Sequence, residues 1–342
     1  MPSHDPSAPP LRIGVLLPTR EMAVTGDYSI GPLLDFAREA EDLGFDSLWA
    51  GDSLTARPRL DPLVVLAAVS AVTRGIGLGT AALTAALRHP LIGANTAASL
   101  DHASGGRLTL GLGAGFPVPE SAAEFAAVGV PFDSRVGRLD ETVRLWRQAW
   151  RADGGPAAAE FTGRYWHIDG LDRLPGPATP GGPPLWLASS DTPRVLSRVA
   201  RHYDGWLPFL PDPKAYRVAR ERITELAEQH GRAPYAVTPG LYATLNVQAD
   251  RRRAEAALDT YVQGYYGRQL AVMNTVQAYG WGSPRECADW LAEYVAAGAR
   301  HLVLRIGSLD PRPHLRQIAE EVLPVLRASR PAGPVHADQP HQ

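Results

Sequence analysis

The sequence predicts an α/β fold, a (β/α)8 barrel of the TIM-barrel type, on three observations. Short apolar segments of strand length alternate with longer segments of helical periodicity along most of the 342 residues. The apolar strands show no clear alternation of polar residues, which is typical of a parallel sheet covered on both faces. There are eight such strands in strand and helix alternation, the number that closes this barrel.

The predicted strands are short, apolar and bounded by glycine, proline or polar residues. In chain order they are Ile13–Leu17, Ser47–Ala50, Gly77–Leu83, Arg107–Leu112, Pro184–Ala188, Gly205–Phe209, Thr238–Val247 and His301–Ile306.

The predicted helices follow the strands and place their apolar residues on one face, as Leu139, Val143 and Trp146 do in the fourth. They are Gly31–Leu43, Pro62–Val72, Pro90–His102, Ser134–Trp150, Pro193–Arg201, Pro213–His230 and Pro313–Leu326.

Residues 11–328 are expected to form a single domain, with disordered tails at 1–10 and 329–342 that are rich in proline and polar residues. Two connections exceed the usual length, at about 153–183 and 249–284. The first is predicted to hold a small hairpin. The second is read as a long aromatic loop after strand seven. Both insertions are expected at the C-terminal face, as lids or oligomer contacts.

Composition excludes several classes of function. A net charge of −2 and a pI near 6.6 provide no general attraction for nucleic acid or an anionic membrane. There is no run of 18 apolar residues and no apolar signal core, so we expect a soluble cytoplasmic protein. Cys287 is the single cysteine, and no histidine pair has the i, i+4 spacing with an acid, so no metal site is predicted.

The end of the fourth strand carries the sequence Gly111-Leu112-Gly113-Ala114-Gly115. Alternating glycines leave one side of a strand without side chains, where a flat ligand could lie against the backbone. A bulge or a tight turn from strand to helix explains the same glycines equally well. The run does not match the G-x-G-x-x-G dinucleotide fingerprint.

An ordered set of motifs resembles the bacterial luciferase-like superfamily of flavin- and deazaflavin-dependent oxidoreductases, from Leu11 to about Leu326. The motifs are Gly79-Thr80-Ala81-Ala82, Arg88-His89-Pro90, Leu100-Asp101 with Ser104 and Gly106-Arg107, and the Gly111, Gly113 and Gly115 run. The resemblance implies a cofactor ring over the third and fourth strands, with a cis peptide at Ala81–Ala82. The implied contacts to the cofactor are Thr80, Ala81, Ala82, Gly113, Ala114, Gly115, Ser189, Ser190, Asp191 and Thr192.

Ser189, Ser190, Asp191 and Thr192 precede a helix that begins with proline, a natural phosphate site and equally an ordinary helix cap. In the family this position holds the cofactor phosphate, which favours the phosphate site here. Ala114 stands where some members carry a phosphate-binding arginine, so this chain lacks that contact.

Catalytic and substrate groups are less well marked. Asp52 and His89 are the candidate catalytic residues, although Asp52 could instead bond a loop and His89 could be a turn residue. Relatives commonly have histidine after the acid of strand two, where this chain has Ser53. Arg20, Ser53 and Arg305 are the candidate substrate contacts, and both arginines could equally form ion pairs at the rim.

The resemblance implies a monooxygenase that uses reduced FMN and O2 to oxygenate a small organic substrate, with a flavin reductase as a possible source of the reduced cofactor. One alternative is hydride transfer by coenzyme F-420 in the same fold. Another is a barrel that binds a flavin without catalysis. We expect a homodimer, with the aromatic segment after strand seven or the fourth helix as the contact.

Overall fold

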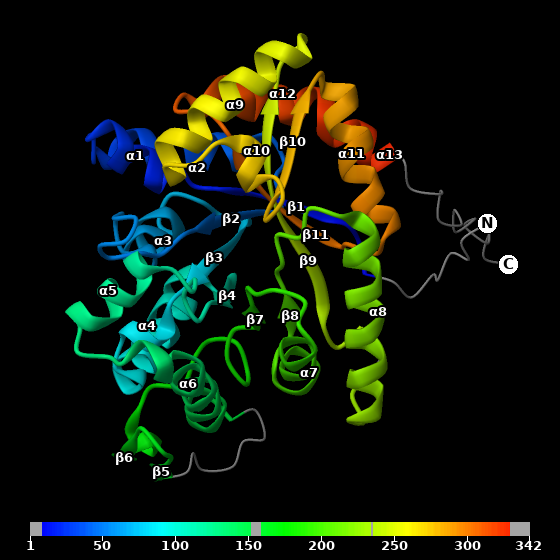
Figure 1. The fold of residues 1–342 in the computed structure, drawn as a ribbon. Helices are drawn as coiled ribbons and strands as arrows, with labels where there is room; N and C mark the ends of the chain where they lie inside the picture. Colours follow the sequence, from blue (N-terminus) through cyan, green and yellow to red (C-terminus); the bar gives the residue numbers. More distant parts are fainter. Residues whose placement is uncertain (1–8, 152–158, 234, 329–342) are drawn as a thin grey trace, which may run out of the picture.

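A computed structural model describes residues 9–151, 159–233 and 235–328, and eight parallel strands form a closed ring in it (Figure 1). The ring order is β11, β1, β2, β3, β4, β7, β8 and β9, and pairing of β9 with β11 closes the ring. The (β/α)8 barrel prediction is confirmed. The ring strands are β1 (Arg12–Leu16), β2 (Ser47–Ala50), β3 (Gly77–Leu83), β4 (Leu108–Leu112), β7 (Leu185–Leu187), β8 (Gly205–Trp206), β9 (Thr238–Val247) and β11 (His301–Ile306).

Helices surround the ring, and the predicted ones begin and end within about two residues of the expected positions. They are α2 (Ile30–Asp42), α3 (Pro62–Ser70), α4 (Pro90–Ser104), α6 (Arg135–Ala149), α7 (Pro193–His202), α8 (Pro213–Gln229), α12 (Pro311–Gln317) and α13 (Leu323–Ala328), with a π-helical turn, Ile318–Val322, between the last two.

Local sequence explains where several helices begin. Asp61 accepts hydrogen bonds from the free amides of α3, and Asp212 does the same for α8. Proline occupies the first turn of both helices, where its missing amide costs nothing. These caps account for the accuracy of the predicted helix starts.

The segment 249–284 corrects the prediction of a long loop. It contains helix α9 (Arg251–Tyr266), a short helix α10 (Leu270–Met273) and strand β10 (Ala278–Gly282), which pairs in parallel with the end of β9. Helix α11 (Pro284–Ala296) then precedes the last barrel strand. The aromatic residues that suggested a loop pack as a core between α9 and β10.

Other differences are smaller. Besides α9 and α10, three helices were absent from the predicted set: α1 (Thr19–Thr25), α5 (Pro119–Ala127) and α11. Strand six is only the two residues of β8. The predicted hairpin is present as β5 (Glu160–Thr162) and β6 (His167–Asp169). The predicted tails lie outside the described residues, apart from Pro9 and Pro10, and so does the part of the first insertion at 152–158.

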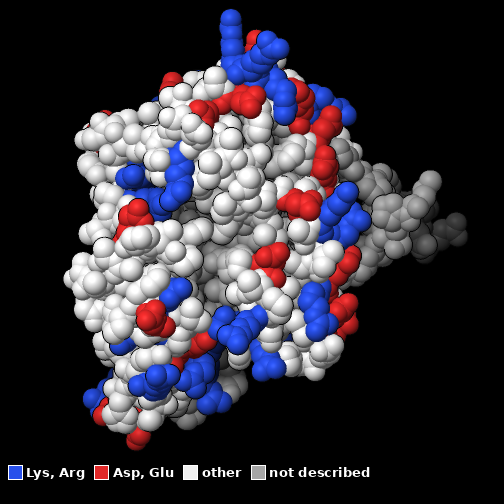
Figure 2. Space-filling model, in the orientation of Figure 1, with Lys and Arg blue, Asp and Glu red and all other residues white. Residues whose placement is uncertain are grey.

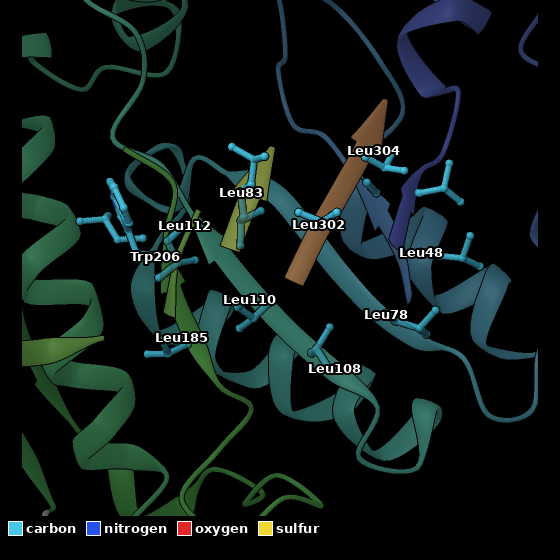
Figure 3. Packing of buried hydrophobic residues seen from close by; sticks show 14 of the residues in the cluster. Leu48, Leu78, Leu83, Leu108, Leu110, Leu112, Leu185, Trp206, Leu302 and Leu304 are labelled. Atoms are coloured by element: carbon cyan, nitrogen blue, oxygen red, sulfur yellow. The ribbon is translucent and has the colours of Figure 1, made fainter. Parts of the chain in front are cut away.

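The outer core lies between the strands and the helices. Alternate residues of each strand face outward, and in Figure 3 the leucines of β4, Leu108, Leu110 and Leu112, lie on one face of the strand. Leu302 and Leu304 do the same on β11. The residues between these leucines on each strand must therefore point into the barrel.

The inner core is built from two tryptophans opposed by glycines. Trp49 and Trp186 lie with ring centroids 5.3 Å apart inside the barrel. A methyl group on Gly79 would collide with Trp49, and one on Gly205 would collide with Trp186. The barrel thus has room for these large rings only because the neighbouring strands carry glycine.

His301 lies beneath the tryptophans at the start of β11, and its buried Nε2 is 2.8 Å from the Ser47 hydroxyl. That hydroxyl accepts a hydrogen bond from Trp49 Nε1, so it is placed to donate its own proton to an unprotonated Nε2. Burial, reinforced by Arg12, lowers the pKa of His301 to about 3. The imidazole is therefore neutral in the folded protein.

We predict that this neutral histidine makes stability fall as the pH is lowered from about 6.5 towards 3. In that window the unfolded chain binds a proton that the folded chain does not, at about 1.4 kcal/mol per pH unit. Above about 6.5 the contribution is complete. Between pH 7 and pH 5, the free energy of unfolding measured with urea should fall by about 2 kcal/mol more in wild type than in His301→Gln. Equal losses in the two proteins would contradict the assignment.

Candidate functional site

Small residues line one side of the barrel mouth, at the C-terminal ends of adjoining strands. Side chains alternate along a strand, and Trp49 and Trp186 point into the barrel. By the same alternation, the inward positions at the strand ends are Gly51 after β2, Ala81 on β3, Gly113 after β4 and Ala188 after β7. The strands β3, β4 and β7 are neighbours in the ring, so Ala81, Gly113 and Ala188 form a continuous surface, whereas Gly51 beside them is covered by Arg59. A barrel mouth floored by glycine and alanine has room for a flat ligand.

The glycine run after β4 divides into two roles. A methyl group on Gly111 would collide with the Thr80 carbonyl, so this glycine allows close approach of two backbones and does not face a ligand. At Gly113 a methyl group would meet only Ala82 Cβ, at 3.3 Å. Gly115 has a φ of +85°, so it makes a turn. Only Gly113 therefore fits the prediction of bare backbone facing a flat ligand, and the alternative of close packing or a turn holds for Gly111 and Gly115.

The third strand is irregular where the mouth begins. The Ala81–Ala82 peptide is cis, as predicted. Thr80 is fully buried and its hydroxyl donates to the Gly111 carbonyl at 2.8 Å, so its side chain holds the two strands together. Ala81 and Ala82 are partly exposed and are the groups of this segment that can meet a ligand.

The predicted phosphate site lies beside Gly113, because the Ala188 amide bonds the Leu112 carbonyl across β4 and β7. Ser189 Oγ is buried, and in the described part of the chain it has no hydrogen-bond partner. Thr192 is the residue before α7, and no described side chain caps that helix. Ser190 is partly exposed and Asp191 is exposed. Free amides and an unpartnered buried hydroxyl therefore occur together at this strand end.

Asp52 is held in an ion pair and is not placed as a free acid. Its carboxylate accepts from Arg88 Nη1 at 2.6 Å and from the Thr84 amide at 2.9 Å, and its side chain is 2% exposed. Arg88 also bonds Asp61 at 2.7 Å. Burial opposes the charge on Arg88, but the bonds to the two carboxylates raise its pKa above the usual value. The network fixes the ends of β2 and β3 relative to α3.

Ser53, a predicted substrate contact, is used internally. Its hydroxyl donates to Glu124 Oε1 at 2.8 Å, and the same oxygen accepts from the amides of Thr55 at 2.9 Å and Ala56 at 3.3 Å. One buried carboxylate on α5 thus organises the whole loop after β2. No sequence pattern pointed to Glu124, because its partners are 68 to 71 residues away along the chain.

His89 lies directly before α4 and is exposed. Its ring meets Trp166 of the β5 and β6 hairpin edge to face, with centroids 5.0 Å apart. Its place before α4 agrees with the alternative of a turn residue, and the contact with Trp166 adds a packing role that was not predicted.

Arg305 was predicted to contact the substrate or to form an ion pair at the rim, but it is 1% exposed and is bonded inside the protein. Its guanidinium donates to Thr244 Oγ1 at 2.9 Å, Tyr266 OH at 2.7 Å and Tyr279 OH at 3.2 Å. The ring of Tyr265 lies 4.5 Å from its central carbon. Arg305 therefore ties the α9 and β10 insertion to the barrel.

A buried carboxylate belongs to the same cluster. Glu21 on α1 is 5% exposed, and Tyr261 OH donates to its Oε1. Burial raises the pKa of Glu21, and the Tyr261 bond and the nearby Arg305 limit the rise. Burial alone would raise the pKa of Tyr266, but the adjacent Arg305 lowers it overall. These tyrosines were predicted only as aromatic residues of an insertion, so their role depends on tertiary packing.

In the described ranges, no three histidine, cysteine, aspartate or glutamate side chains gather closely enough to hold a metal ion. No helix in the same ranges has the length and apolar character needed to cross a membrane.

Fold and mouth together define a (β/α)8 barrel of the luciferase-like class, with small residues at the ends of β3, β4 and β7. The family model for luciferase-like monooxygenases matches residues 11–301, and the chain belongs to this family. The resemblance seen in the sequence is therefore confirmed.

An F420-dependent glucose-6-phosphate dehydrogenase from Kineococcus radiotolerans is 27% identical, over 94% of this chain and 99% of the relative. Among solved structures, the monooxygenase RslO1 from Streptomyces bottropensis has a TM-score of 0.74 at 20% identity and covers 92% of this chain and 99% of its own. An F420-dependent secondary alcohol dehydrogenase has a TM-score of 0.75 at 19% identity, with 93% and 99% covered. The chain is an oxidoreductase of this family.

Proposed function

We propose that the protein binds coenzyme F-420 with its ring over Ala81, Ala82 and Gly113, and catalyses hydride transfer to or from a small organic substrate. The observation that carries the proposal is the continuous seat of small residues on β3, β4 and β7, next to the unpartnered Ser189 hydroxyl. Ser189, Ser190 and the amides at the start of α7 would hold the cofactor phosphate. The bound deazaflavin would supply the two-electron chemistry.

F-420 is placed ahead of FMN because a dehydrogenase named for it is similar over nearly the whole chain. The sequence alone had favoured FMN. The chain's own groups do little proton chemistry at the ring in either case, because Asp52 and Ser53 are engaged by Arg88 and Glu124. Their role is to orient the ring and to shape a mouth from which water is excluded.

Oxygenation of a small organic substrate with reduced FMN and O2 is the second candidate. The structural likeness to the monooxygenase RslO1 supports it at the level of fold. A flavin reductase would then be needed as a partner to supply reduced FMN.

Anaerobic titration with oxidised and reduced F-420 and FMN, followed by absorbance, tests both candidates. We expect F-420 to bind with micromolar affinity, and Gly113→Val to weaken binding at least tenfold because its side chain fills the seat. Gly31→Ala is the matched control, because a methyl group there meets nothing within 4 Å.

Tight binding of reduced FMN with oxygen consumption on admission of air would move the assignment to the second candidate. Binding of neither cofactor by folded wild-type protein would overturn the proposed function.

A further inference from the structure

Three arginines gather on the side of the mouth opposite the proposed phosphate site. Arg20 is the second residue of α1, and Arg57 and Arg59 lie in the connection between β2 and α3. Figure 2 shows basic side chains gathered between α1 and α3. Within the described ranges, no carboxylate oxygen lies within 4.0 Å of any of the three guanidinium groups. They are therefore cations without a direct counter-charge.

Arg59 reaches the floor of the mouth. A methyl group on Gly51 would collide with Arg59 Nη1, and would lie 3.5 Å from the Ala81 carbonyl oxygen. The guanidinium thus lies directly over Gly51, next to the segment on which the cofactor ring is proposed to lie. A substrate on that ring would lie within reach of this charge.

Tyrosines of α9 hold the three side chains in place. Arg20 and Arg59 lie 5.8 and 5.9 Å from the ring centre of Tyr265, and Arg57 lies 5.0 Å from that of Tyr266. Arg59 Nη2 also donates to Tyr265 OH at 3.3 Å. Stacking on aromatic rings orients a guanidinium and leaves its charge available. Arg20 Nε is buried with no partner among the described residues.

Repulsion within the cluster acts on Arg20. Burial lowers the pKa of Arg20, and Arg59 and Arg57 lower it further by repulsion. At Arg59 burial opposes the charge, but Tyr265 and Glu21 outweigh it and raise the pKa. The nearby carboxylate, Glu21, is bonded to Tyr261 and does not reach salt-bridge distance. Planar guanidinium forks match the oxygens of a carboxylate or phosphate, and an anion bound among them would relieve this repulsion.

We propose that Arg20, Arg57 and Arg59 form an anion subsite that binds a carboxylate or phosphate group of the substrate. This inference rests on the proposed function, which places the cofactor ring between the subsite and the phosphate site at Ser189. The enzyme would select substrates that carry an anionic group about one ring width from the reacting carbon.

Calorimetric titration of the full-length protein with inorganic phosphate, with and without saturating F-420, tests the subsite. Wild type saturated with F-420 should bind phosphate at the arginines alone, because the cofactor leaves them free and fills the proposed phosphate site at Ser189. Arg57→Gln with Arg59→Gln should weaken that binding at least tenfold and leave F-420 affinity within about twofold. Lysine at both positions should restore part of the phosphate affinity, and Arg252→Gln with Arg253→Gln on the exposed face of α9 should have no effect.

Unchanged phosphate affinity in the glutamine double variant would overturn the subsite. Loss of F-420 affinity in that variant would assign the anion to the cofactor and overturn the substrate assignment. If the wild-type protein binds neither F-420 nor FMN, the proposed function fails. Phosphate binding that is lost in the glutamine double variant would still support the anion site in that case.

Discussion

Arg305→Met is expected to destabilise the protein by about 3–5 kcal/mol, the range measured when one member of a buried charged network is removed. The change deletes three hydrogen bonds, to Thr244, Tyr266 and Tyr279, and leaves Glu21 buried with less opposing charge. Urea unfolding gives the magnitude. Arg253→Met on the exposed face of α9 is the control, with an expected effect below about 0.5 kcal/mol.

The same variant should raise the pKa of Glu21 further, because Arg305 now helps to keep that carboxylate charged. The infrared C=O stretch of a protonated carboxylic acid should then appear at higher pH in Arg305→Met than in wild type. Arg305→Lys keeps the charge but not the three-way fork, so we expect an intermediate loss of stability. If the free energy of unfolding of Arg305→Met lay within about 1 kcal/mol of the wild-type value, the cluster around Arg305 could not be what ties the insertion to the barrel.

Glu124→Leu is expected to cost about 2–3 kcal/mol and to loosen the connection that carries Arg57 and Arg59. One carboxylate oxygen of Glu124 accepts from Ser53 and from the amides at 54, 55 and 56. Without it these donors lose their common acceptor. Hydrogen exchange of the three amides should accelerate at least tenfold, and phosphate affinity should fall together with it.

Glu124→Gln keeps an acceptor oxygen and should lose less than half as much stability as Glu124→Leu. Glu120→Gln, exposed on the same helix, should leave exchange and stability unchanged. Slow exchange of the three amides in Glu124→Leu would mean that the loop is held by other contacts and that Glu124 has no positioning role.

The barrel itself was predictable because its signals are local. Each strand is a short apolar run, as Thr238–Val247 and His301–Ile306 are. The starts of α3 and α8 have a proline and a capping aspartate, which act over three or four residues. The segment after β9 was misread because tyrosine and tryptophan are common in loops and in packed helices alike. What distinguishes them here is the partner, Arg305, which lies 39 residues beyond Tyr266.

In the candidate site, too, features that depend on local sequence were predictable and features that depend on distant residues were not. The gathering of small residues at one edge could be predicted from the glycines and alanines at the strand ends, because the order of the strands and the alternation of their side chains bring Ala81 and Gly113 together. The roles of charged residues could not be assigned. Asp52 and Ser53 looked available for chemistry, but Arg88 and Glu124 occupy them from 36 and 71 residues away.

By itself, the sequence determined the strand and helix alternation, the closed barrel that follows from it and the strand ends where small residues gather. The tertiary structure alone decided which polar groups are free. Backbone periodicity is a local property that hydrophobic burial enforces at every turn. The availability of a charge depends instead on whichever group folding brings within about 4 Å of it, and distance along the chain does not reveal that group.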